Sequence, residues 1–169
     1  MNTMKKILMI AIVLAMSTMA MAQSVGEVID KYKSLDNAES MTMTKDMLSM
    51  MTAMAQNSKD LDAEARESME MMKNIEQMTT LQVKEADAAT ATTLMSDMRK
   101  ALSKGYEITT DMQEDNESVV IAIKKKKKKD NHASEVVIVA KEEKETVVVY
   151  IIGKIDMDKI GNLMNMTKD

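Results

Sequence analysis

The chain has 169 residues and a formal net charge of −4 at pH 7, with no cysteine, proline, phenylalanine or tryptophan. Without cysteine, disulfides, thiol catalysis and a lipid anchor on an N-terminal cysteine are excluded. The modest negative charge argues against general nucleic-acid binding. Aromatic residues are limited to three tyrosines, which lowers the expectation of a small-molecule enzyme because ligand pockets are rich in aromatic side chains.

The first 22 residues have the pattern of a secretory signal peptide. Lys5 and Lys6 form a short basic region, an apolar run follows at 7–15, and an Ala-Met-Ala sequence at 20–22 precedes Gln23. A membrane anchor is the alternative, but a bilayer span needs ~20 apolar residues. We expect cleavage after residue 22, which leaves a single domain at 23–169. Loss of the two lysines makes the mature charge −6.

Helices and short strands are expected in the first two-thirds of the chain. Apolar residues at helical spacing predict helices from Val25 to about Ser34, Lys45 to Ala55, Asp60 to Lys73 and Asp87 to Lys104. Alternating polar and apolar residues predict a half-buried strand from Ser40 to Thr44, and a less regular pattern predicts another from Ile75 to Val83. Ser24 and Gly105 are suited to cap the first and last of these helices.

The last third changes to a period of two residues. Strands are predicted at Tyr106–Met112, Ser118–Lys126, Ser134–Lys141 and Thr146–Gly153, and the short turns between them imply an antiparallel meander. A closing helix follows Asp156 and carries Met157, Ile160, Leu163 and Met164. The fold class is therefore α+β, with helices and short strands followed by a C-terminal meander and a closing helix.

Two of these strands are apolar on both faces, at 136–140 and 147–152. Strands of this kind are buried on both sides. We therefore expect either helices on both faces of the sheet or a partner on one of them.

This layout resembles the DUF4252 family of Bacteroidota exported proteins, a domain of unknown function. The matching segments are the signal peptide ending in Ala22-Gln23, the Val28-Ile29-Asp30-Lys31-Tyr32 helix, Thr44-Lys45-Asp46-Met47-Leu48 and the strand from Val147 to Asp156. The resemblance covers nearly the whole mature chain and implies an exported α+β domain, in the periplasm or at the outer-membrane periphery of a Gram-negative bacterium. It supplies no catalytic residues.

Methionine is the compositional outlier, with 22 residues. Met47, Met50, Met51 and Met54 lie at i, i+3, i+4 and i+7, which places them on one helix face. Packing in the core is the favoured interpretation, because methionine fills irregular apolar space. The alternatives are a Cu(I) or other soft-metal site, since thioethers are soft ligands, and scavenging of oxidants by exposed sulfurs.

Six consecutive lysines follow the second strand of the meander: Lys124, Lys125, Lys126, Lys127, Lys128 and Lys129. We favour a solvated hairpin tip, where lysines also discourage pairing between sheet edges. A contact with an anionic lipid surface is the functional alternative, at roughly 1 kcal/mol per lysine.

No constellation of residues indicates catalysis. His132 is the single histidine and is expected in an exposed turn, where a Ser-His-Asp triad could not form. A carboxylate-only hydrolase needs only two acids, and the sequence contains many.

The sequence favours an exported, non-catalytic binding or scaffolding domain that has no cofactor. Its expected partner is an unknown envelope protein or another copy of the chain. No nucleic acid is expected as a partner, and no membrane span is expected after cleavage. Methionine chemistry is the second hypothesis, and the hydrolase is the last.

Overall fold

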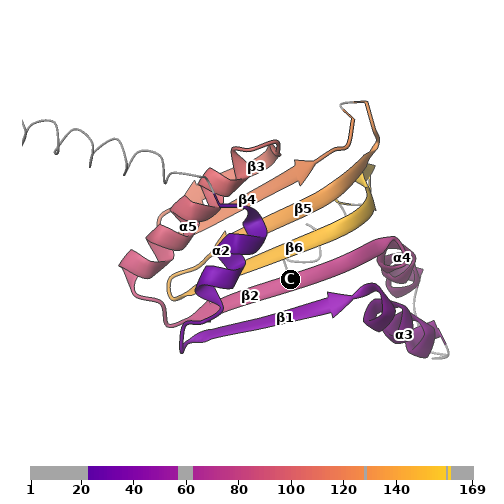
Figure 1. Cartoon of the computed structure of the whole chain (residues 1–169), viewed down its shortest axis with the longest axis horizontal. Helices are drawn as coiled ribbons and strands as arrows, with labels where there is room; N and C mark the ends of the chain where they lie inside the picture. The colour runs from indigo at the N-terminus through magenta and orange to yellow at the C-terminus, as the bar shows by residue number, and fades with distance from the viewer. Residues whose placement is uncertain (1–22, 57–62, 128, 159, 161–169) are drawn as a thin grey trace, which may run out of the picture.

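The computed structural model describes residues 23–56, 63–127, 129–158 and 160. Its helices are α2 (Val25–Tyr32), α3 (Lys45–Gln56), α4 (Ala63–Met72) and α5 (Ala88–Leu102). Its strands are β1 (Ala38–Thr44), β2 (Ile75–Lys84), β3 (Glu107–Glu114), β4 (Glu117–Lys124), β5 (His132–Lys141) and β6 (Glu145–Asp156). The predicted α+β class is confirmed (Figure 1).

Within the described ranges the strands form one six-stranded sheet in the order β1-β2-β6-β5-β4-β3. All of the pairings are antiparallel, so the predicted meander of the last four strands is confirmed. β2 pairs with β6 and carries β1 at its other side. The last of the described strands, β6, therefore lies in the interior of the sheet, and β1 and β3 form its edges.

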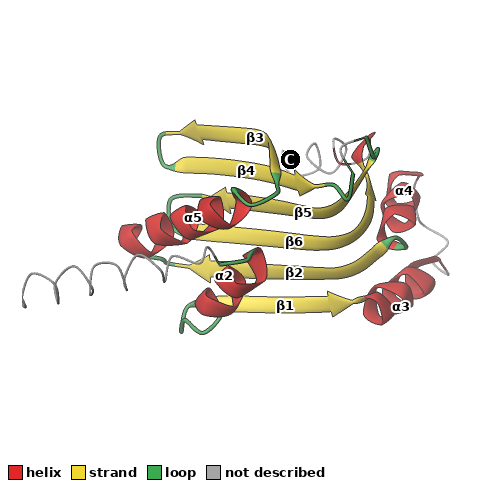
Figure 2. Cartoon of the chain, turned by 45° about the horizontal axis from the view of Figure 1, so that its top comes forward, coloured by secondary structure: helices red, strands yellow, loops and turns green. Residues whose placement is uncertain are grey.

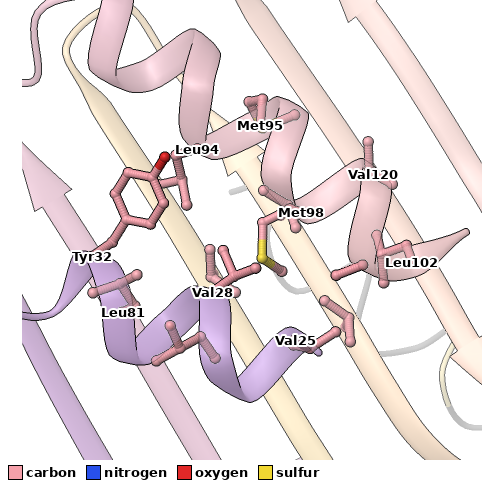
Figure 3. Packing of buried hydrophobic residues seen from close by; sticks show 14 of the residues in the cluster. Val25, Val28, Tyr32, Leu81, Leu94, Met95, Met98, Leu102 and Val120 are labelled. Carbon is pink, nitrogen blue, oxygen red and sulfur yellow. The ribbon is translucent and has the colours of Figure 1, made fainter. Parts of the chain in front are cut away.

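Helices α2 and α5 cover one face of the sheet (Figure 2). Ser24 starts α2 with a capping box, in which its hydroxyl accepts the Glu27 N–H and the Glu27 carboxylate accepts the Ser24 N–H. Asp87 caps α5 by accepting the Thr90 N–H at 2.7 Å. Both helices turn their apolar stripes inward, and Figure 3 shows Val25, Val28, Tyr32, Leu94, Met95, Met98 and Leu102 meeting Leu81 and Val120 of the sheet.

A second apolar cluster lies apart from the first and includes Leu48 of α3, Ile75, Ile123, Val136 and Ile151. β5 contributes to both clusters, because Val137 belongs to the first and Val136 to the second. Alternation along a strand sends such neighbours to opposite faces. The prediction that the central strands are buried on both faces is therefore confirmed, and helices contribute to the burial of each face.

The C-terminal part differs from the expected boundaries. β6 continues to Asp156, and the Asp156 carboxylate accepts the N–H of Asp158 at 3.0 Å. Ile160 is buried in the second apolar cluster. Leu163 and Met164 of the predicted closing helix, and the whole predicted signal peptide, lie outside the described residues. None of the described helices has the length and apolarity needed to cross a membrane.

Candidate functional site

The four methionines of α3 are on the surface. Their exposed fractions are 46% for Met47, 64% for Met50, 51% for Met51 and 69% for Met54. The preferred prediction of core packing is therefore wrong. The buried positions of this helix are Leu48 and Thr52, whose side chains are 2% and 5% exposed.

The position of α3 explains the difference. The helix follows edge strand β1 and lies at one end of the sheet, where only a narrow part of its circumference meets other elements (Figure 1). Successive residues of a helix are rotated by about 100° around its axis. The middle of the arc formed by the four methionines therefore lies about a third of a turn from Leu48 and Thr52. Leu48 is the α3 residue that belongs to the second apolar cluster, and the Thr52 hydroxyl donates a hydrogen bond to the Leu48 carbonyl at 2.8 Å.

We call Met47, Met50, Met51 and Met54 the methionine face. Met41 of the preceding strand is 60% exposed as well. Among the described residues these five methionines make up most of the large apolar side chains that are exposed, the others being Ile108 and Met112 of β3. A cluster of exposed apolar side chains on one element is a feature of interaction surfaces.

The first two lysines of the run contact neighbouring parts of the sheet. Lys124 ends β4 and its ammonium donates to Glu135 at 2.9 Å, and it also lies over the ring of Tyr106 at 5.3 Å. Lys125 lies 4.0 Å from the carboxylate of Glu107. These two side chains hold neighbouring elements together, so they are less available to an external anion than the rest of the run.

The later lysines form the connection between β4 and β5, which we call the lysine hairpin (residues 126–131). Lys126, Lys127 and Lys129 are exposed, and residue 128 lies outside the described residues. Asp130 closes the turn: its carboxylate accepts the Lys127 N–H at 3.2 Å, and its own N–H donates to the Lys127 carbonyl at 3.0 Å. The predicted hairpin tip is therefore confirmed for the described lysines after Lys125.

A polar cluster that the sequence analysis missed surrounds Glu135. The carboxylate accepts hydrogen bonds from the hydroxyls of Tyr106 and Tyr150 and from the Lys124 ammonium. The available signal was an acidic residue in an apolar strand, directly opposite Lys124 in the register of β4 and β5. Tyr106 could not have been assigned to it from sequence, because it comes from the connection between α5 and β3.

The Glu135 cluster shifts the pKa values of its members. Burial raises the pKa of Glu135, but the hydrogen bonds from Tyr106, Tyr150 and Lys124 outweigh burial and lower it below its ordinary value of 4.5. Burial and the hydrogen bond to Glu135 raise the pKa of Tyr150 to about 12. The same causes raise the pKa of Tyr106. At neutral pH the cluster is thus a carboxylate held by two neutral phenols and an ammonium, which is a stabilising arrangement.

His132 lies elsewhere than predicted. It is the first residue of β5, half-buried and opposite Asp156 of β6, instead of being in an exposed turn. It lines a surface depression of about 500 Å³ together with Lys126, Asp130 and Lys154. A smaller cavity of about 130 Å³ shares His132 and Lys154 and extends to α4.

Two acids, Glu76 and Asp130, line the larger depression, as a carboxylate-only hydrolase would require. However, Asp130 is already engaged in closing the lysine hairpin. Ser134 also lines the depression, and its hydroxyl donates to the Lys124 carbonyl at 3.0 Å. Both side chains therefore have structural roles in this structure. Within the described ranges, no group of three or more histidine, aspartate or glutamate side chains is placed to hold a metal ion.

A family model described as a domain of unknown function (DUF4252) matches residues 32–163 of the chain. The chain belongs to the DUF4252 family. The comparisons with curated proteins and with solved structures found no match. The DUF4252 match begins at the end of α2 and includes the methionine face, the Glu135 cluster and the lysine hairpin. All three features are thus part of the DUF4252 domain, whose description assigns no role to any residue.

Proposed function

We propose that the mature protein is exported to the cell envelope and acts as a non-catalytic binding domain, with the methionine face of α3 as its contact surface. The signal-peptide pattern of residues 1–22 supports export. The exposure of Met47, Met50, Met51 and Met54 carries the binding proposal. The partner is an envelope component or another copy of the chain.

The chemistry of methionine suits this role. The thioether side chain is unbranched and polarizable, so that a methionine surface adapts to partners of different shape. Leu48 anchors the helix from the adjacent part of its circumference. The contact surface can therefore be altered without removing the residue that holds α3 in place.

Two matched quadruple variants test the proposal. Changing Met47, Met50, Met51 and Met54 to Gln removes the apolar surface, whereas changing them to Leu keeps it and removes only the sulfur. In a whole envelope extract that contains membranes, we expect the wild type and the Leu variant to be retained by an envelope component and the Gln variant to be released. Equal retention of all three proteins would show that the methionine face is not the contact surface.

The exposure of the four sulfurs also favours a second candidate function, soft-metal binding or oxidant scavenging. The methionines lie within two turns of one helix face, and the spacing i, i+3, i+4 and i+7 brings their side chains together. Thioether sulfur suits Cu(I), and exposed methionine is oxidised reversibly to the sulfoxide.

The same variants separate the two functions. Anaerobic titration with Cu(I) would support the second candidate if the wild type formed a one-to-one complex that both the Leu and the Gln variants lost. The binding proposal expects no such complex, and expects the Leu variant to behave as the wild type in the envelope extract. Oxidation to sulfoxide, followed by mass spectrometry, would support scavenging if the methionine face were consumed before the other methionines.

A further inference from the structure

The methionine face and the lysine hairpin lie at the same end of the sheet. Figures 1 and 2 both show α3, α4 and the β4–β5 connection at one end of the strands, and Figure 2 shows the β3–β4 and β5–β6 turns at the other. The two features are more than 70 residues apart in sequence. From the sequence, a lipid contact was an alternative for the lysine run alone and was not connected with the methionines. Their common location is a result of the fold.

The surface between them is continuous. The larger depression is bordered by Lys126 of the lysine hairpin and by Lys154 of β6. The smaller cavity shares Lys154 with it and reaches Met71 of α4. Helix α4 in turn contacts α3. This end of the molecule therefore presents, in order, exposed lysines, a surface depression and an apolar helix face.

We propose that this end docks onto the surface of an anionic phospholipid bilayer. The proposal rests on the binding function proposed above and names its partner. The methionine face would enter the interfacial region, and Lys126, Lys127 and Lys129 would contact the phosphates. Within the described part of the chain these three lysines form no ion pair, in contrast to Lys124 and Lys125.

Charge favours a bilayer over a second copy of the chain. A symmetric dimer through this end would bring two lysine hairpins towards each other, which like charges oppose. The mature protein carries a charge of −6, so an anionic bilayer repels the molecule as a whole and attracts only its cationic end. Glu76 and Asp130 offset the lysines inside the depression. The contact is therefore made by the hairpin tip and the methionine face, in a single orientation.

Co-sedimentation of the mature protein with protein-free vesicles tests the proposal. We expect binding to vesicles of phosphatidylglycerol and phosphatidylcholine in equal parts, weaker binding at physiological salt, and little binding to phosphatidylcholine alone. Changing Lys126, Lys127 and Lys129 to Gln should lower the partition coefficient at low salt by about a hundredfold. The Met→Gln quadruple variant should lower it by about tenfold or more, and the Met→Leu variant should retain it.

A variant with the same change in charge provides the control. Lys33 lies in the connection from α2 to β1, and Lys141 and Lys144 lie at the β5–β6 turn, which is at the opposite end of the strands. Changing these three lysines to Gln should leave vesicle binding nearly unaltered. If the control variant lost as much vesicle binding as the lysine-hairpin variant, the attraction would be non-specific and the proposal would be overturned. The same holds if the lysine-hairpin variant lost binding and the Met→Gln variant did not. Thermal unfolding of each variant verifies that it is folded.

Insertion of α3 can be followed directly, because the chain has no tryptophan. Met50→Trp places a fluorophore on the methionine face, and Ser49→Trp places one on the opposite side of the exposed helix surface. We expect the emission of the Met50 variant alone to shift to shorter wavelength with phosphatidylglycerol vesicles. If the emission of neither tryptophan variant shifts and the wild type does not sediment with the vesicles, the bilayer proposal fails. Retention in envelope extract that is still lost in the Met→Gln variant would then leave the binding function standing, with a protein partner.

Discussion

Met51 and Leu48 are neighbours on α3 with opposite surroundings, and they give the first prediction. Met51 is 51% exposed and Leu48 is 2% exposed. We expect Met51→Ala to change the free energy of unfolding by no more than about 0.5 kcal/mol, whereas Leu48→Ala should cost about 2–5 kcal/mol through loss of buried contacts. Urea denaturation of both variants is the measurement. Comparable losses would mean that the methionine face is covered.

Glu135 gives a prediction of pH dependence. Its pKa is lowered in the folded protein, so the stabilisation is present above its ordinary pKa of 4.5 and is lost as the pH falls through the folded pKa. The difference in unfolding free energy between the wild type and Glu135→Gln should be constant near neutral pH and shrink on acidification. Tyr150→Phe removes one donor and should reduce this dependence on pH. A difference that grows below pH 4.5 would contradict the assignment.

The lysine run gives a prediction for the β4–β5 element. Changing Lys126, Lys127 and Lys129 to Gln alters exposed charges at a hairpin tip and should change the free energy of unfolding by about 0.5 kcal/mol or less. Lys124→Gln removes a donor from the half-buried Glu135 and should cost about 1–3 kcal/mol. Thermal or urea unfolding measures the stability of the triple variant and of Lys124→Gln. A larger loss in the triple variant would assign the hairpin tip a structural role.

Elements with local signals could be predicted from the sequence. The start of α2 was evident because Ser24, Glu27 and the first buried valines occur together. The start of α5 was equally evident from Asp87. The buried side of α3 could not be predicted, because the methionine face and Leu48 occupy adjacent arcs of one helix. Which of these two arcs is buried depends on where α3 lies beside the sheet. The local sequence pattern does not determine the order of the strands in the sheet.

The Glu135 cluster could not be predicted from the sequence either, because its side chains are brought together by strand pairing. Tyr106, Glu135 and Tyr150 come from three parts of the chain, and each is unremarkable in its own segment. Their meeting depends on the pairing of β5 with both β4 and β6. Likewise, β1 was expected to be half-buried, but Met41 is 60% exposed because the strand forms an edge of the sheet.

At the scale of the whole molecule, the export proposed above would place the contact surface in the cell envelope. Mass spectrometry of the native protein should find an N-terminus at Gln23, either free or cyclised to pyroglutamate, because cleavage is expected after Ala22. When envelope membranes are washed with concentrated salt, the mature protein should be found in the supernatant. A chain with an intact Met1 that resists this extraction would identify residues 1–22 as an anchor.

The position of β6 has a consequence for how the chain folds. Among the described strands β6 comes last in the chain, and within the described sheet it alone joins β2 to β5. Until it is available, β1–β2 and β3–β4–β5 are separate ribbons that share no backbone hydrogen bonds. Its pairing with β2 also closes a loop of more than 60 residues, a slow step because contacts distant in sequence carry a large entropic cost. A nascent chain therefore stays without a complete core until β6 is available, and a chain that folds late is suited to the export proposed above.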